Sequence, residues 1–214
     1  EAECGSCDGG QVCSDNTCVD EVSPLEECAS MRFDGSSGHI EVGDSSELTD
    51  FDDGLTMEAW VHLDGFGADS CQVIARKHEG NKMGYTFSIV GEGEISFFSE
   101  GNPAGGAKSA GVVQIGQWAH VAVTLDGETA RFWHNGAMVH EQGQILPEAT
   151  DDNLFIGGFP PGSKCYLDGS LSQLRISGSV VYTEDFEPPQ VLVSDASTRG
   201  FWPLNDIATE DFDA

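Results

Sequence analysis

The sequence predicts an all-β fold, a sandwich or barrel of antiparallel strands, with a small cysteine-rich segment at its N-terminus. Short runs rich in β-branched and aromatic residues recur at intervals of about 8–12 residues, and turn residues separate them. Glycine is frequent, with 27 residues among 214. Hardly any stretch has the apolar period of a helix. The length is enough for one well-buried domain and an appendage.

Residues 118–142 have the clearest strand pattern in the chain. Asp126-Gly127 and Asn135-Gly136 separate three runs of strand-forming residues. Asx-Gly pairs adopt the positive φ angles that tight hairpin turns require. The pattern therefore predicts three consecutive antiparallel strands. The runs cover residues 118–125, 129–134 and 137–142.

Residues 1–28 differ from the β-domain expected over residues 29–214. Five of the seven cysteines lie in this first unit, which has no basic residue and little that could form a core. Short segments of this kind rely on disulfides, and disulfides persist in oxidising compartments, so we expect an exported protein, extracellular or on the cell surface. A zinc site at Cys4 and Cys7 is the alternative, but the next cysteine pair follows too closely for a zinc ribbon. The seven cysteines are Cys4, Cys7, Cys13, Cys18, Cys28, Cys71 and Cys165.

The formal net charge of −28 comes from 37 acidic and 9 basic residues. A field of this sign repels nucleic acid and anionic lipid, so neither is expected as a partner. No apolar run approaches the roughly 18 residues that a membrane-spanning helix needs, so membrane insertion is not expected either. The acidic surplus is interpreted as an aid to solubility at high ionic strength, with Ca²⁺ binding by some of the acids as the alternative.

Several blocks of sequence, in order, resemble the laminin-G-like, concanavalin A-like domains of bacterial secreted and surface proteins. The most specific block is GQWAHVAVTLDGETARFWHNGAMV (116–139), with a Trp-x-His-Val-Ala strand and an aromatic strand that ends in Asn-Gly. The resemblance implies two antiparallel sheets stacked face to face as a jelly-roll sandwich. The N-terminal CGSCDGGQVCSDNTCV (4–19) is similar to small growth-factor-like modules. Further matching blocks are 31–48, 55–64, 154–158, 166–177 and 181–189.

The resemblance implies a non-catalytic binding module, lectin-like or adhesive, whose partner is a glycan or a cell-surface protein. A structural spacer or protein-interaction domain of a larger surface protein is the alternative. A glycoside hydrolase is a third, remote alternative, which is considered because the same sandwich fold also occurs in such enzymes. Retaining hydrolysis needs two carboxylates about 5–5.5 Å apart, and the nearest pair, Glu92 and Glu94, lies in a glycine-flanked turn. We therefore expect no enzymatic activity and no catalytic residues.

The resemblance also implies one structural calcium ion where the first strand meets a late one. Asp34 lies near this position, with Asp44 and Asp168 as further candidate ligands, and Ca²⁺ takes carboxylate oxygens. The alternative is that all three cap turns through their own backbone. Family members often carry Asp-Glu where this chain has Ser172-Gln173, so any calcium ligand supplied there is lost or altered.

Cys71 and Cys165 are the only cysteines of the β-domain. We expect them to be bonded, because an exported domain seldom leaves two thiols free. The bond would close a loop of about 95 residues and stabilise the domain by about 4–5 kcal/mol.

In the N-terminal unit, growth-factor-like modules cross-link alternately. This analogy implies Cys4–Cys13 and Cys7–Cys18 bonds, while four cysteines allow three connectivities. Cys28 is then left for a bond to another chain or to an upstream cysteine.

The expected Cys71–Cys165 bond also predicts where a ligand binds. It holds the two Cα atoms within about 7 Å, so the loops 63–70 and 157–164 should emerge at one edge of the sandwich. Phe66 and Phe159 would then form an exposed apolar patch, and such patches mark interaction surfaces. The alternative is that both rings plug their own loops. Lys164 and Asp69 would supply polar contacts at the rim, Tyr166 would extend the surface, and Trp133, which alternates with an inward Phe132, is a further candidate for stacking on a sugar.

Overall fold

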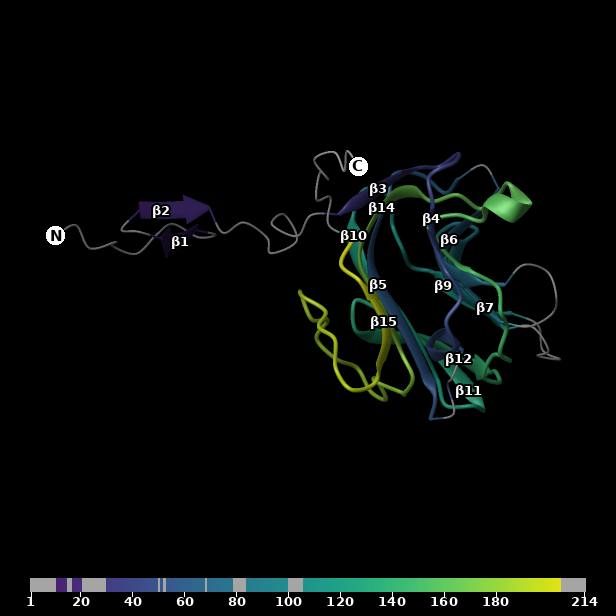
Figure 1. Cartoon of the computed structure of the whole chain (residues 1–214). Coiled ribbons are helices and arrows are strands. Elements are labelled where there is room, and N and C mark those ends of the chain that lie inside the picture. The colour runs from purple at the N-terminus through teal and green to yellow at the C-terminus, as the bar shows by residue number, and fades with distance from the viewer. Residues whose placement is uncertain are drawn as a thin grey trace, which may run out of the picture.

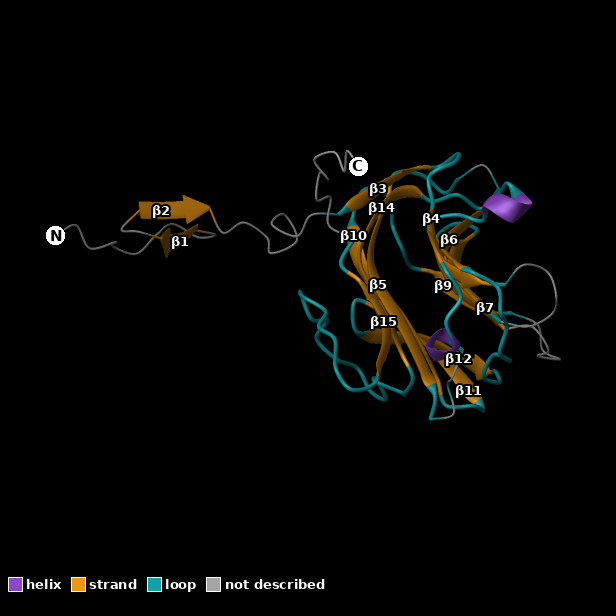
Figure 2. Ribbon diagram, viewed as in Figure 1, coloured by secondary structure: helices purple, strands orange, loops and turns teal. Residues whose placement is uncertain are grey.

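The structure of the chain is a computed structural model that describes residues 11–14, 17–20, 30–49, 51, 53–67, 69–78, 84–99 and 106–204. Two antiparallel β-sheets pack face to face as a jelly-roll sandwich, as the sequence predicted (Figures 1 and 2). Two short 3₁₀ turns, η1 (Ser46–Leu48) and η2 (Pro160–Gly162), lie in its loops. Among the described residues, no helix is long and apolar enough to cross a membrane.

The first sheet has seven strands. They follow the order β12-β11-β10-β5-β14-β15, and β3 pairs with the opposite end of β14 from β15. The predicted strands of residues 118–142 are confirmed as β10, β11 and β12, which pair consecutively. The bounds are β3 (Met31–Asp34), β5 (Leu55–Leu63), β10 (Trp118–Leu125), β11 (Thr129–His134), β12 (Ala137–Gly143), β14 (Asp168–Ser177) and β15 (Thr198–Trp202).

The second sheet has six strands in the order β4-β13-β6-β7-β8-β9. It faces the first sheet across the core, on the right of Figure 1. The bounds are β4 (Ile40–Val42), β6 (Cys71–Lys77), β7 (Tyr85–Val90), β8 (Glu94–Ser99), β9 (Ala107–Gly111) and β13 (Leu154–Ile156).

The N-terminal segment contributes a two-stranded ribbon, β1 (Gln11–Ser14) with β2 (Thr17–Asp20), whose backbone register sets Cys13 opposite Cys18. Cys4, Cys7 and Cys28 lie outside the described residues. The predicted Cys4–Cys13 and Cys7–Cys18 bonds and the interchain role of Cys28 therefore stay predictions.

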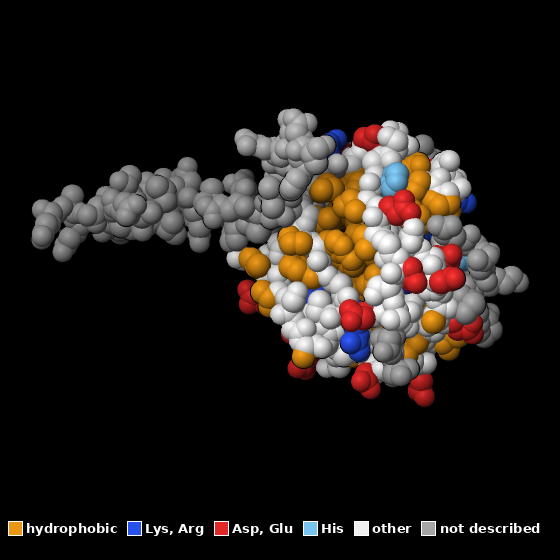
Figure 3. Space-filling view, in the orientation of Figure 1, with side chains coloured by type: hydrophobic (Ala, Val, Ile, Leu, Met, Phe, Trp, Pro, Cys, Tyr) orange, Lys and Arg blue, Asp and Glu red, His pale blue; other side chains and the backbone are white. Residues whose placement is uncertain are grey.

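The core lies between the sheets and follows the alternation of side chains along each strand. Every second residue of β5, from Leu55 to Leu63, is fully buried there, and Phe87 and Phe97 oppose them from the second sheet. Figure 3 shows apolar side chains gathered along one edge of the sandwich. The partly buried side chains packed against the core include Met31, Ile40, Val42 and Trp202.

A long segment, residues 178–197 between β14 and β15, covers the outer face of the first sheet (Figure 2). Tyr182 and Phe186 stack on each other at 3.6 Å between ring centroids, and the Trp60 indole donates a 3.2 Å hydrogen bond to the Pro189 carbonyl. Nearly the whole of β5 is therefore buried on both faces. Thr56 and Glu58, on the outer face of β5, are accordingly fully buried.

Candidate functional site

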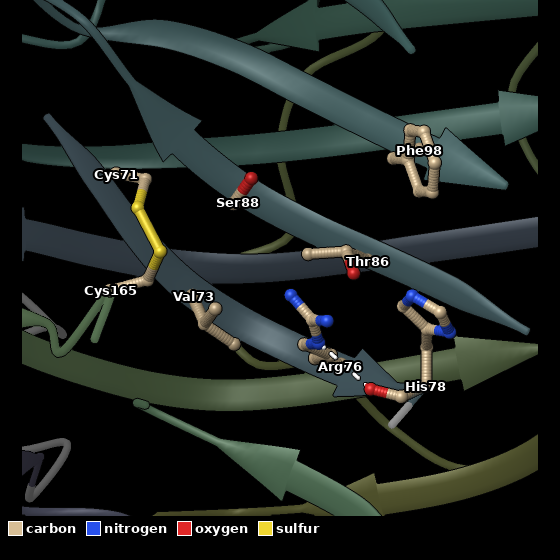
Figure 4. Close-up of a pocket in the computed structure, with 8 residues that line it drawn as sticks. All are labelled: Cys71, Val73, Arg76, His78, Thr86, Ser88, Phe98 and Cys165. Carbon is tan, nitrogen blue, oxygen red and sulfur yellow. Dashed lines mark hydrogen bonds between the residues drawn. A yellow bond between two sulfur atoms is a disulfide. The ribbon is translucent and has the colours of Figure 1, made fainter. Parts of the chain in front are cut away.

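A pocket of about 250 Å³ opens on the outer face of the second sheet, over β6, β7 and β8 (Figure 4). Its residues come from the side of each strand that faces away from the core. Thr86 and Ser88, on β7, alternate with Tyr85, Phe87 and Ile89, which are buried in the core. The described lining residues are Cys71, Val73, Arg76, His78, Thr86, Ser88, Phe98 and Cys165.

A β-bulge in β6 brings an arginine into this pocket. The pairing of β6 with β7 shifts register between Val73 and Ala75. A bulge inserts one residue into the alternation and so changes which side chains face outward. Cys71 and Val73 line the pocket before the bulge and Arg76 after it, while Lys77 points inward and is fully buried.

One wall of the pocket is the disulfide between Cys71 and Cys165, which confirms the predicted bond. The two Cα atoms lie 4.8 Å apart. The backbone around the bond is also fixed, because the Val73 amide donates to the Cys165 carbonyl at 2.9 Å and the Cys165 amide donates to the Asp69 carboxylate at 3.1 Å. The loops that precede the two cysteines therefore meet at one edge of the sandwich, as expected.

The prediction of one exposed patch made by Phe66 and Phe159 is wrong. Phe159 is 6% exposed and packs in a small cluster with Val73, Phe155 and the disulfide, whereas the partly buried Phe66 packs against the main core. The two loops meet, but their rings fill different apolar clusters. Phe159 therefore plugs its own loop, which is the alternative that the sequence left open.

Lys164 and Tyr166 follow Phe159 at the same edge but do not line the pocket. Lys164 is exposed, and its backbone pairs with that of Phe159 in a short bridge. Tyr166 is half-buried and packs over Gly158, where an added Cβ would lie 2.4 Å from the tyrosine ring. Their role as ligand contacts stays a prediction.

The expectation that Trp133 points away from the core is correct, but the expectation of an exposed ring is wrong. Trp133 is fully buried beneath residues 178–197, with its ring centroid 5.6 Å from that of Phe186, and its indole donates to the Thr124 hydroxyl at 3.2 Å. Because another layer of the chain covers this face of the sheet, Trp133 has no surface to offer to a sugar.

The three candidate calcium ligands separate into two places. Asp34 and Asp168 are direct partners in the pairing of β3 with β14, where the first strand of the domain meets a late one. Asp44 follows β4 in the other sheet, where its carboxylate accepts a 2.5 Å hydrogen bond from the buried Lys77. The three therefore do not form one site, and within the described ranges no group of three or more His, Cys, Asp or Glu residues is placed to hold a metal ion.

Asp34 caps its own turn. Its carboxylate accepts hydrogen bonds of 2.8–2.9 Å from the amides of Ser36, Ser37 and Gly38 and from the Ser37 hydroxyl. These donors, led by the Gly38 amide, hold the pKa of Asp34 far below its usual range. The turn-capping alternative for Asp34 is thus confirmed, and a calcium ion at this edge stays a prediction.

The pocket combines three kinds of surface. The disulfide, Val73 and Phe98 supply apolar walls, and Thr86 and Ser88 supply hydroxyl groups. Arg76 supplies a positive charge, and its orientation is fixed because its Nε donates to the His78 carbonyl at 2.9 Å. Small-molecule sites are typically mostly apolar with a few well-placed polar groups, so this arrangement suits a small polar ligand with an apolar face.

The family model for the concanavalin A-like lectin/glucanases superfamily matches residues 34–185, which is most of the chain. The chain belongs to this superfamily. No curated protein matches the sequence. Several solved structures resemble the chain at low sequence identity and share its sandwich fold.

Three of these structures are informative. A candidate carbohydrate-binding protein of Bacteroides ovatus is 16% identical with a TM-score of 0.65, over 83% of this chain and 52% of that one, so the chain spans about half of its length. The carbohydrate-binding module (CBM40) of the Ruminococcus gnavus IT-sialidase, bound to α2,3-sialyllactose, is 12% identical with a TM-score of 0.59, over 72% and 92%. Domains LG4-5 of the mouse laminin α1 chain are 14% identical with a TM-score of 0.53, over 73% and 44%.

Proposed function

We propose that this chain is a non-catalytic, extracellular glycan-binding module whose binding site is the pocket over β6, β7 and β8. The Thr86 hydroxyl carries the proposal. Thr86 is 9% exposed and lines the pocket, and its Oγ1 has no hydrogen-bond partner among the described residues. A buried polar group without a partner is costly. A sugar hydroxyl would satisfy it, while the C–H face of the sugar ring packs against Val73 and Phe98.

The structural neighbours support a sugar as the ligand. The Ruminococcus gnavus module is bound to sialyllactose, and the Bacteroides ovatus protein is described as carbohydrate-binding. The laminin domains have the same sandwich. A single fold hosts many functions. The neighbours therefore support only the class of ligand, a carbohydrate, and the position of the binding site is argued from the pocket.

The acidic side chains support a role without catalysis. Glu94, half of the nearest carboxylate pair in the sequence, is held by the Lys108 ammonium, whose Nζ lies 2.9 Å from both of its oxygens. Glu58 is fully buried beneath residues 178–197 and has no access to a substrate. None of the described pocket residues is a carboxylate, and glycoside hydrolysis needs two.

Export is part of the proposal because of the disulfide between Cys71 and Cys165. This bond joins residues 94 positions apart and forms a wall of the pocket. Disulfides persist in extracellular and periplasmic environments and are rare in the cytosol. The proposed site therefore needs an oxidising compartment to stay intact.

Binding of the unchanged chain and of the Thr86→Val variant to a glycan array, with and without EDTA, tests the function. The change keeps the branched shape and removes the hydroxyl, so we expect bound glycans to lose roughly tenfold in affinity, the scale of one lost hydrogen bond in a buried site. Thr129→Val, on β11 of the other sheet, is the matched control and should bind normally. An effect of EDTA would indicate a calcium ion in recognition.

A flat array would overturn the proposal and favour the structural spacer. Equal loss of binding in Thr86→Val and Thr129→Val would place the site outside the pocket.

A further inference from the structure

We infer that the pocket takes a sugar residue that carries an acetamido group, with the methyl end of that group against the disulfide between Cys71 and Cys165. This inference rests on the proposed function and adds the chemical class of the ligand. It starts from the order of the lining side chains along the pocket. The disulfide end combines apolar side chains with the Ser88 hydroxyl, and further along lie the Thr86 hydroxyl and the Phe98 ring (Figure 4).

The pairing of β6, β7 and β8 sets these side chains in two rows across the sheet. Val73 on β6 is the direct partner of Ser88 on β7. Thr86, also on β7, is the direct partner of Phe98 on β8. Ser88 and Thr86 are two positions apart, so they face the same way with their Cα atoms about 6.5 Å apart. The two rows are therefore spaced by roughly the width of one sugar ring.

The disulfide end of the pocket has an apolar floor. Cys71 and Val73 are two positions apart on β6 and line the pocket beside Cys165. Val73 is 1% exposed, and it packs with Cys165 in the same small cluster as Phe155 and Phe159. The Val73 amide is already used, because it donates to the Cys165 carbonyl at 2.9 Å. A sugar hydroxyl over this floor would give up hydrogen bonds to water for little in return, whereas a methyl group gains from burial.

The Ser88 hydroxyl borders this floor and supplies a polar partner. Figure 4 shows Ser88 near the Cys71 end of the disulfide and Val73 near its Cys165 end. A hydroxyl group both donates and accepts hydrogen bonds, so it can pair with the N–H or the C=O of an amide. An acetamido group is flat, with a methyl group beside an amide. Its two parts therefore match the apolar floor and the Ser88 hydroxyl.

The sugar ring then lies over the second row. The Thr86 Oγ1 has no hydrogen-bond partner among the described residues, and a ring hydroxyl would satisfy it. The half-buried Phe98 ring beside it offers an apolar surface to the C–H face of the sugar. The pocket volume of about 250 Å³ lies below the roughly 300–1,000 Å³ of sites for drug-sized ligands. The pocket therefore has room for about one substituted ring.

Calorimetric titration of the whole chain with matched sugars tests the inference. The probes are the methyl glycosides of N-acetylglucosamine and N-acetylgalactosamine, each beside the methyl glycoside of its parent hexose, glucose or galactose. We expect at least one acetamido sugar to bind tenfold or more tighter than its parent. Burial of one methyl group contributes about fourfold, and the hydrogen bond to Ser88 contributes the rest. The N-formyl analogue keeps the amide without the methyl group, so it should bind about fourfold more weakly than the acetamido sugar.

Variants locate the effect. Ser88→Ala should reduce the preference for the acetamido sugar several-fold and leave the affinity for the parent hexose nearly unchanged. Ser170→Ala, on β14 of the other sheet, is the matched control and should bind like the unchanged chain. If Ser88→Ala does not fold, the paired sugars and the N-formyl analogue on the unchanged chain still decide the question.

Equal affinity for the acetamido sugars and their parent hexoses would overturn the inference and leave the proposed glycan-binding function standing. Tighter binding of methyl fucoside than of both acetamido sugars would also overturn it, because the methyl group of fucose carries no amide. A preference that Ser88→Ala leaves unchanged would place the acetamido group elsewhere, with the same consequence. Failure of every sugar to bind would instead remove the proposed function itself.

Discussion

The guanidinium of Arg76 lies over the ring of Phe159, 3.7 Å from its centroid. Phe159 packs in turn against Phe155, at 6.0 Å between ring centroids, and belongs to the cluster that includes the disulfide. The arginine that lines the pocket is therefore supported by a loop that lies more than 80 residues further along the chain. The disulfide between Cys71 and Cys165 tethers that loop to β6.

This contact predicts that Phe159→Leu lowers the affinity for the ligand, beyond any effect that it has on the stability of the fold. Leucine fills much of the buried space but has no aromatic face, and a cation–π contact contributes about 0.5–2 kcal/mol. The affinity for a glycan bound in the pocket should fall several-fold by calorimetry. Phe132→Leu, in the main core on β11 of the other sheet, is the control: it should lower the melting temperature and leave the affinity nearly unchanged. Equal effects of both variants on affinity would show that Phe159 acts only through packing.

The disulfide predicts a large change in stability. Replacing Cys71 and Cys165 together by alanine removes a cross-link between residues 94 positions apart, which costs about 4–5 kcal/mol of loop-closure free energy in the ideal case. Urea denaturation of the double variant should show a correspondingly lower midpoint. Its affinity for glycans should also fall, because the bond is a wall of the pocket. Modification of Cys71 by an alkylating agent in the native, unreduced chain would contradict the bond.

The fold was predictable because its signals are local. Asp126-Gly127 and Asn135-Gly136 mark the turns of two hairpins in the sequence. The β-domain contains only two cysteines, so each has a single possible partner within it. The pocket was not predictable in this way. Thr86, Ser88 and Arg76 come from two strands whose register includes a bulge, and no residue type in the sequence marks where the alternation changes.

Trp133 shows a second reason why part of the site could not be predicted. Alternation along β11 correctly placed it on the face away from the core. The sequence pattern does not distinguish a face open to water from one covered by another layer of the same chain. Residues 178–197 form that layer, and they begin more than 40 positions after Trp133. The same layer buries Glu58, an acidic residue on the outer face of β5.

The turn capped by Asp34 predicts a pH dependence of stability. Hydrogen bonds from the amides of Gly38, Ser37 and Ser36 lower the pKa of Asp34 in the folded chain, whereas the unfolded value is about 3.9. A lowered pKa means that the contribution to stability is present above pH 4 and is lost as the pH falls below it. Asp34→Asn should therefore have a lower melting temperature at pH 7, and the difference should shrink between pH 4 and pH 2.

Calorimetric melting curves at pH 7, 5, 4 and 3 measure this difference. Asp151→Asn, at an exposed position, should match the unchanged chain at each pH. A gap between Asp34→Asn and the unchanged chain that stays constant down to pH 3 would contradict the role of the charged carboxylate.

Glu58 is the centre of a buried polar cluster that attaches residues 178–197 to the first sheet. Its carboxylate accepts hydrogen bonds from Arg175 at 2.5 and 2.8 Å, from the Tyr182 hydroxyl at 2.7 Å and from His120 Nε2 at 3.0 Å. Burial by itself would raise the pKa of Glu58, but the His120 hydrogen bond and the charges of His120 and Arg175 outweigh it, so the pKa is lowered. The Arg175 guanidinium also donates to the Val193 carbonyl at 2.7 Å, within the same segment.

Glu58→Gln should therefore loosen this segment as well as destabilise the fold. It removes the buried carboxylate that faces Arg175 and leaves only that of the half-exposed Asp195, 3.6 Å away, and removal of one partner from a buried ion pair costs about 3–5 kcal/mol. Urea denaturation should show that loss, and tryptophan fluorescence of the native state should shift to the red as water reaches Trp133. Glu187→Gln, exposed in the same segment, should change neither reading. Because the pocket lies on the opposite sheet, the folded Glu58→Gln variant should keep its affinity for sugars, and a loss there would mean that residues 178–197 take part in recognition.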